Sequence, residues 1–237
     1  MIYFLRNVFW SPIKFILSFF PNSYGRFVKL SIINALSYIG FSNSLNRMDK
    51  SIIEFFNYKK NGFCLEVGGA DGIDQSNSLH LERIYNWKSF LVEPTTDQFN
   101  LLKRYRKNAV CERYAFISSD SFATEKNIKI KLNNLQSTIV SKNSDSDGHR
   151  TELVPTNTLD NFFIDHGISN LDLLILDVEG YEIQVLEGYK KDQSIINFML
   201  VEAANFEDFD AYAKSRNWKF IKNIGIDYLY SLKSDIN

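Results

Sequence analysis

Cysteine and proline are scarce in this chain, and long apolar runs are missing. Its 237 residues include two cysteines, Cys64 and Cys111, both in apolar runs, and four prolines. Two thiols make neither a disulfide scaffold nor a zinc cluster, so each is predicted to be a small buried hydrophobe in a reducing compartment. Hydrophobic residues make up 45% and charged residues 23% of the chain, which excludes a disordered or collagen-like protein.

Acidic residues are missing from the first 48 positions. That segment carries five basic residues, whereas the remaining 189 residues carry 22 basic and 28 acidic ones. The formal net charge of −1 is therefore the sum of a basic, aromatic segment and an acidic domain. An acidic domain does not favour a nucleic-acid partner, because such binders are usually basic.

The N-terminal segment lacks a window that could cross a membrane. About 20 mostly apolar residues are needed, and every such window is interrupted by Arg6, Pro12, Lys14, Pro21 or Arg26. No small-residue cleavage site follows the apolar run at 15–20, so a signal peptide is not predicted. Two short amphipathic helices broken at the prolines are expected over residues 1–40. They either cover an edge of the domain or anchor it peripherally to an anionic membrane.

From about residue 51, short apolar strands alternate with helices. The predicted strands cover 62–67, 88–93, 110–117, 171–177, 195–202 and 220–232, with an extra strand at 128–132. Helices are predicted at 76–85 and 97–107, and a polar loop at 137–150. This alternation is typical of βαβ units and a mostly parallel sheet. The sequence thus predicts a basic helical segment over 1–50 and an α/β domain over 51–237.

A glycine-rich turn follows the first predicted strand, with the sequence Glu66-Val67-Gly68-Gly69-Ala70-Asp71-Gly72. Glycines there allow a tight turn and a close approach of a ligand to the backbone. The spacing differs from the dinucleotide fingerprint GxGxxG, because Gly72 lies four positions after Gly68 and position 70 is alanine. It fits the acidic-x-Gly-x-x-x-Gly turn of Rossmann-like methyltransferases.

Glu93 ends the second predicted strand, immediately before Pro94. A carboxylate at this point can accept hydrogen bonds from both hydroxyls of a ribose. The alternative is that Glu66 caps the turn and that Glu93 is an exposed strand end. Ser76, Asn77 and Ser78 are predicted to cap the next helix and to donate to a cofactor carboxylate.

A second acidic cluster, Asp177, Glu179 and Glu182, follows the strand at 171–177. Carboxylates so close together repel one another unless they are paired, hydrogen-bonded or bound to a cation, which predicts a raised pKa for at least one of them. A raised pKa is typical of a general base. Glu182 equally suits a helix N-terminus. His149 and His166 are alternative bases, and a divalent cation beside Asp177 and Glu179 is chemically sensible but not established.

Two long strings carry a family resemblance. VPTNTLDNFF…LDLLILDVEGYEIQVLEGY, over 154–189, resembles the signature of the FkbM-like methyltransferases. DGIDQSNSLHLERIYNWKSFLVEP, over 71–94, resembles one branch of that family. The resemblance spans about residues 62–202 and leaves out the first 50. Glu66 and Gly69 depart from many members, which have aspartate and a different small residue there.

This resemblance implies a Rossmann-like class I methyltransferase fold: a mostly parallel seven-stranded sheet with helices on both faces. It also implies O-methylation of a hydroxyl, often on a sugar of a glycan, with S-adenosylmethionine as cofactor. Asp177, as base, and Glu179 would face the transferring methyl group. Carried onto this chain, the cofactor-binding residues are Glu66, Gly68, Gly69, Ala70, Asp71, Gly72, Ser76, Asn77, Glu93, Pro94, Ala115, Phe116 and Asp177.

Two other functions stay open at this point. A nicotinamide-dependent oxidoreductase is disfavoured by the missing GxGxxG, and a non-catalytic nucleoside-binding scaffold would keep the pocket without needing a base. A nucleic-acid substrate is not predicted, because the carboxylates would repel its phosphates. A cytoplasmic protein is expected, either free or held peripherally at the inner face of a membrane.

Overall fold

The computed structural model describes residues 22–42, 44–132, 138–139, 150–190 and 195–232. Several sequence-based predictions lie outside these residues. They are the helix expected before Pro21, most of the loop at 137–150, and His149 as an alternative base.

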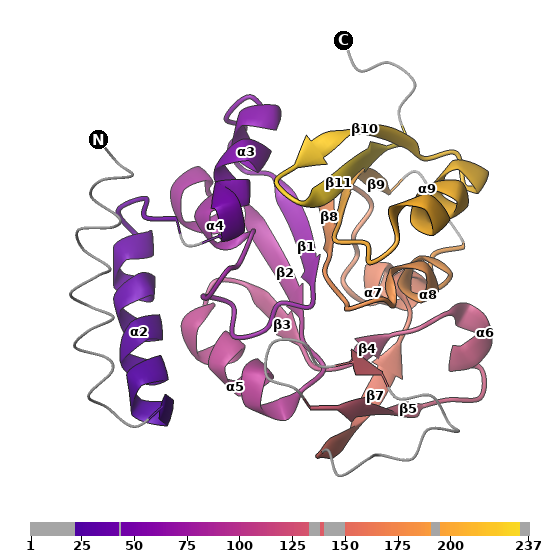
Figure 1. Ribbon diagram of the computed structural model, residues 1–237, viewed down its shortest axis with the longest axis horizontal. Coiled ribbons are helices and arrows are strands. Elements are labelled where there is room, and N and C mark those ends of the chain that lie inside the picture. Colours follow the sequence, from indigo (N-terminus) through magenta and orange to yellow (C-terminus); the bar gives the residue numbers. More distant parts are fainter. Residues whose placement is uncertain (1–21, 43, 133–137, 140–149, 191–194, 233–237) are drawn as a thin grey trace.

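A seven-stranded sheet lies at the centre of the molecule, with the strand order β10-β11-β9-β8-β1-β2-β3 (Figure 1). Neighbouring strands from β9 to β3 are parallel, whereas β11 runs antiparallel to both β9 and β10. The predicted fold class is therefore confirmed. The strands are β1 (Phe63–Val67), β2 (Lys88–Val92), β3 (Val110–Glu112), β8 (Leu171–Leu176), β9 (Ile196–Val201), β10 (Lys219–Ile224) and β11 (Asp227–Ser231).

Helices cover both faces of this sheet, and β8 shows why. Successive residues of a strand point to opposite faces, so Leu173 and Ile175 pack toward one side and Leu174 and Leu176 toward the other. The first side is covered by α3 (Met48–Phe55) and α4 (Leu79–Tyr85), and α5 (Thr96–Tyr105) links β2 to β3. The second is covered by α7 (Leu159–Asp165), α8 (Glu182–Leu186) and α9 (Phe206–Ser215). All six residues of β8 are buried, as expected for a covered parallel strand.

Two predicted strands are wrong in their extent. The run at 110–117 divides into β3 and β4 (Ala115–Phe116), because the chain leaves the central sheet after β3 and pairs β4 with β7. The run at 220–232 is a hairpin of β10 and β11, in which Gly225 adopts a φ of 64° between the two strands. Cys111 is only partly buried because β3 is an edge strand, whereas Cys64 is buried as predicted.

A smaller sheet, in the order β4-β7-β5-β6, lies beside the carboxyl edge of the central one (Figure 1). It contains the predicted extra strand, β5 (Asn127–Lys131), together with β6 (Thr138–Ile139) and β7 (Thr151–Asn157). The short helix α6 (Ser119–Phe122) follows β4.

The described part of the N-terminal segment is one helix, α2 (Asn22–Ser37), and a short 3-10 turn, η1 (Leu45–Arg47). Leu30 and Ile33 of α2 are buried against Ile73, Leu79 and Tyr105 of the domain. This packing agrees with the interpretation that the segment covers an edge of the domain. Of the helices in the described ranges, none is both long and apolar enough to cross a bilayer.

Strands β1 and β8 end in close contact at Gly68. The amide of Asp177 donates to the carbonyl of Val67 over 3.1 Å. A Cβ atom at Gly68 would lie 1.8 Å from the Asp177 carbonyl oxygen, and Gly68 has a φ of +89°. Glycine is therefore required here, and its presence brings the glycine turn against Asp177.

We expect Gly68→Ala to reduce the free energy of unfolding by more than about 3 kcal/mol. The left-handed backbone alone costs an alanine roughly 1–2 kcal/mol, and the clash with Asp177 adds to that cost. Gly167→Ala is the matched control, because Gly167 has a φ of +61° and a Cβ atom added there would meet nothing within 4 Å. Urea unfolding measures both variants, and equal losses would contradict the close approach.

Candidate cofactor and active site

A cavity of about 560 Å³ opens at the carboxyl edge of the central sheet. Its walls come from the turn after β1, the end of β2, the segment around β4 and the turn after β8. The structure therefore brings together nearly all the residues predicted for the site. Those that line the cavity are Glu66, Gly68, Gly69, Ala70, Ser76, Asn77, Glu93, Pro94, Ala115, Phe116, Asp177 and Glu179.

Asp71 and Gly72 do not line the cavity, so their position disagrees with a direct contact to a ligand. Asp71 is 1% exposed, and its Oδ1 accepts hydrogen bonds from the amides of Ile73 and Asp74. The carbonyl of Gly72 accepts from Arg106 over 3.0 Å. Both residues hold the turn from the side away from the cavity.

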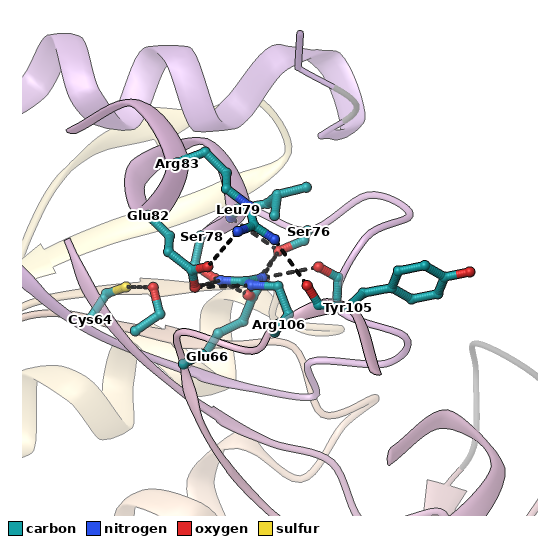
Figure 2. Close-up of polar contacts among 12 residues, drawn as sticks. Cys64, Glu66, Ser76, Ser78, Leu79, Glu82, Arg83, Tyr105 and Arg106 are labelled. Carbon is teal, nitrogen blue, oxygen red and sulfur yellow. Dashed lines mark hydrogen bonds and ion pairs between the residues drawn. The ribbon is translucent and has the colours of Figure 1, made fainter. Parts of the chain in front are cut away.

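Glu66 is the anchor of the glycine turn. Its carboxylate accepts hydrogen bonds from the hydroxyls of Ser76 and Ser78 and from the amide of Asn77 (Figure 2). The hydroxyl of Ser76 also accepts from the amide of Leu79 over 3.2 Å and so satisfies the first amide of α4, whereas the N-cap residue Ser78 makes no side-chain capping bond. Ser76 and Ser78 are therefore already bonded within the protein, and their backbone geometry fixes the cavity wall.

Arg106 lies beneath this turn and is 1% exposed. It donates to the hydroxyls of Ser76 and Ser78 over 3.0 and 2.9 Å and forms two bonds with Glu82 of 3.1 and 2.9 Å (Figure 2). The two hydroxyls thus donate to Glu66 while accepting from the guanidinium. A buried guanidinium needs such complete pairing. Sequence reasoning missed this role, because the pattern around Arg106 is that of the exposed end of a basic amphipathic helix.

Glu93 is buried, at 6% exposure, and the alternative of an exposed strand end is wrong. Its Oε1 accepts from the amide and the hydroxyl of Thr95 over 2.9 and 2.6 Å, and its Oε2 accepts from the amide of Ala70 over 3.1 Å. Burial raises the pKa of Glu93 above its ordinary value, and these hydrogen bonds act against that rise. The Ala70 bond joins the end of β2 to the glycine turn.

A cluster of carboxylates lies around Asp177 at the end of β8. Burial first, and then the charges of Glu202 and Glu179, raise the pKa of Asp177 to about 8. Burial and Glu202 raise the pKa of Asp227 to about 7. The predicted elevation of a carboxyl pKa in this cluster is thus confirmed. Glu182 is buried, and its Oε1 accepts from the amide of Gly180 over 2.9 Å.

Sequence reasoning missed Glu202 and Asp227. Glu202 ends the predicted strand at 195–202, on the same sheet edge as Asp177, so its position was an available signal. Asp227 gives no such signal, because the pattern at 220–232 does not reveal the hairpin of β10 and β11. Tyr181, Val178 and Glu202 line the cavity together with Asp177 and Glu179.

The charge of the cavity is of one sign. Carboxylates come from the turns after β1 and β8 and from the ends of β2 and β9, whereas no lysine, arginine or histidine lines the cavity within the described ranges. His166 lies elsewhere, with its ring against Phe90 and Phe162 and its Nε2 3.5 Å from Glu112. In the same ranges, no group of three or more His, Cys, Asp and Glu side chains is arranged to hold a metal ion. The cavity is therefore suited to a cationic or neutral ligand.

Comparison with known proteins gives one family. The family model of the methyltransferase FkbM domain matches residues 66–228, and no curated protein matches the chain. A putative caffeoyl-CoA O-methyltransferase from Staphylococcus aureus is 10% identical, with 86% of this chain and 92% of that chain covered and a TM-score of 0.48. A TehB-like SAM-dependent methyltransferase from Corynebacterium glutamicum is 8% identical, with 90% and 100% covered and a TM-score of 0.47.

Fibrillarin from Aeropyrum pernix, in complex with natively bound S-adenosyl-L-methionine, is 12% identical with a TM-score of 0.41. The alignment covers 73% of this chain and 66% of fibrillarin, so the chain spans just under two thirds of that relative. These likenesses are too distant to indicate what the chain acts on.

The raised pKa of Asp177 predicts a pH dependence of stability. With a pKa of about 8 in the folded protein against an ordinary 3.8, Asp177 holds a proton at neutral pH that the unfolded chain has lost. Stability therefore falls as the pH rises through 8. Between about pH 7 and pH 9, the free energy of unfolding of the wild type should fall by about 1.4 kcal/mol more than that of Asp177→Asn, which is the equivalent of one pKa unit. Urea unfolding at constant ionic strength measures this, and identical pH slopes would contradict it.

Proposed function

Because residues 66–228 show that this chain belongs to the methyltransferase FkbM family, we propose that it is an S-adenosylmethionine-dependent O-methyltransferase that acts on a carbohydrate hydroxyl. One observation carries the proposal: a half-buried carboxyl group with a raised pKa, Asp177, adjoins the glycine turn in one cavity.

The cavity suits the cofactor in charge and in shape. S-adenosylmethionine carries a positive sulfonium and an ammonium group, and the lining offers carboxylates for both. We assign the methionine end to the backbone at Gly68, Gly69 and Ala70, where side chains are absent or small. We assign the ribose to Glu93, whose two oxygens are held in place by Thr95 and Ala70. Ala115 and Phe116 would contact the adenine.

When bound, the cofactor supplies an electrophilic methyl group. The chain's own task is to orient the acceptor hydroxyl and to take its proton. Asp177 is suited to that task, because a base with a pKa near the working pH is the most effective. A cation beside it lowers its pKa, so that it is ionised when the site is loaded. Holding the acceptor in line supplies much of the remaining acceleration.

The uniform negative charge of the cavity limits which acceptor molecules it can bind. Phosphate or carboxylate groups near the reacting hydroxyl would be repelled by Asp177, Glu179 and Glu202. A neutral sugar meets no such repulsion, and its hydroxyls can donate to the more exposed Glu179 and Glu202. The same argument disfavours a nicotinamide dinucleotide, whose pyrophosphate would face these carboxylates.

We also propose that the N-terminal segment contacts a membrane peripherally. The two charged residues of α2, Arg26 and Lys29, form ion pairs with the domain, whereas Tyr24, Phe27 and Tyr38 are exposed. An exposed aromatic face on a helix that follows a basic, aromatic sequence is typical of interfacial helices. Full-length protein should sediment with anionic liposomes and not with neutral ones, and failure to sediment with either would overturn this proposal.

The catalytic role of Asp177 predicts a large loss of turnover. Asp177→Asn removes the proton acceptor, so methyl transfer should fall about 10²–10⁴-fold while the variant still binds S-adenosylhomocysteine. The measurement is incorporation of labelled methyl groups from S-adenosylmethionine into glycans extracted from the native host.

Asp165→Asn is the control, since Asp165 is an exposed residue of α7 outside the cavity. It should transfer methyl groups at the wild-type rate. Two results would overturn the proposal: full turnover by Asp177→Asn, or no incorporation by the wild-type protein into any glycan fraction.

A further inference from the structure

One wall of the cavity is a loop in which two residues adopt an unfavourable backbone conformation. The loop covers residues 70–77, of which Ala70 and Asp74–Asn77 line the cavity. Ala70 and Gln75 have φ values of 43° and 63°, in the left-handed region that side chains other than glycine rarely adopt. Such residues persist when surrounding contacts over-determine them. The contacts that hold this loop are therefore part of the site.

Several of these contacts come from α2. Arg26 donates to Asp71 Oδ2 over 2.9 Å and to Gln98 Oε1 over 2.7 Å, and Gln98 lines the cavity. Lys29 forms an ion pair with Asp74, another lining residue. Figure 1 shows α2 beside α4 and α5, on the side of the domain where this loop lies.

Further contacts come from the chain after α2. The backbones of Ser44 and Gln75 form an isolated parallel bridge. The Ser44 hydroxyl, which is 3% exposed, donates to Asn77 Oδ1 over 2.7 Å. Leu45 lines the cavity itself. Asp74, Gln75 and Asn77 are thus each held by a residue that lies before position 46.

We propose that Arg26, Lys29, Ser44 and Leu45 act together as a clamp that sets the cofactor affinity of the cavity. Arg26, Lys29 and Ser44 are positioning residues: they act through the loop at 70–77 and through Gln98. The inference rests on the proposed function, because it takes the loop to be the wall against which S-adenosylmethionine binds. The clamp lies outside the family match at 66–228, so it is a property of this chain beyond the matched domain.

The first test measures the loop without any ligand. In Arg26→Met and Ser44→Ala, amide hydrogen exchange at residues 70–77 should be at least about tenfold faster than in the wild type, because the contacts that oppose local opening are gone. Lys59→Met is the matched control. Lys59 pairs with Asp172 over 2.6 Å at the amino end of β8, away from the cavity. Its loss should leave exchange at 70–77 unchanged.

The second test measures affinity by calorimetry with S-adenosylhomocysteine. Arg26→Met and Lys29→Met should weaken binding about tenfold, whereas Lys59→Met should bind as the wild type does even if its thermal stability falls. Arg26→Lys should recover part of the affinity, because the charge is kept while the two-partner geometry is reduced.

The outcomes separate the two proposals. If the clamp variants exchange the amides of residues 70–77 at the wild-type rate, the clamp is overturned, whether or not the protein binds S-adenosylhomocysteine. Faster exchange with unchanged affinity would overturn its role in binding. Faster exchange in a protein whose wild type does not bind S-adenosylhomocysteine would overturn the proposed function, and the clamp's role in affinity with it.

Discussion

The rest of the site depends on the close approach of β1 and β8 at Gly68. The two strands pair in parallel as far as Val67 and Leu176. The next residues, Gly68 and Asp177, lie in contact with the opposite strand end. A side chain at Gly68 would separate the glycine turn from Asp177. Because there is none, a backbone suited to a close-fitting ligand and a carboxyl group suited to proton transfer face the same cavity.

Electrostatics then divide the acidic residues into two groups. Those behind the turn are neutralised by cations: Glu82 by Arg106, and Asp71 by Arg26. Those at the open rim, around Asp177, have carboxylates for neighbours, and burial and mutual repulsion raise the pKa of Asp177 and of Asp227. The cations of the protein therefore maintain the shape of the cavity, whereas no lysine, arginine or histidine of the described ranges lines the rim around Asp177.

Much of this site was predictable from local sequence, because strand ends and glycine turns are local features. The ends of β1, β2 and β8 carry Gly68, Glu93 and Asp177 at a common sheet edge, and strand order alone brings them together. The long-range contributions could not be predicted. The burial of Arg106 depends on packing beneath a turn that lies 30 residues away in the chain.

The N-terminal segment illustrates the same limit. Its composition predicted a helix covering the domain or an anchor, but not the pairing of Arg26 and Lys29 with the turn. Asp227 was missed because a glycine at 225 reverses the chain inside an otherwise continuous strand-like pattern. The division of the chain at residue 50 stays a prediction.

The central claim is that this cavity binds the sulfonium cofactor and not a dinucleotide. Calorimetric titration of the wild-type protein with S-adenosylhomocysteine and, separately, with NAD⁺ tests it most directly. We expect saturable one-to-one binding of S-adenosylhomocysteine, weakened in Glu93→Gln, and no binding of NAD⁺. Binding of NAD⁺ without binding of S-adenosylhomocysteine would contradict it.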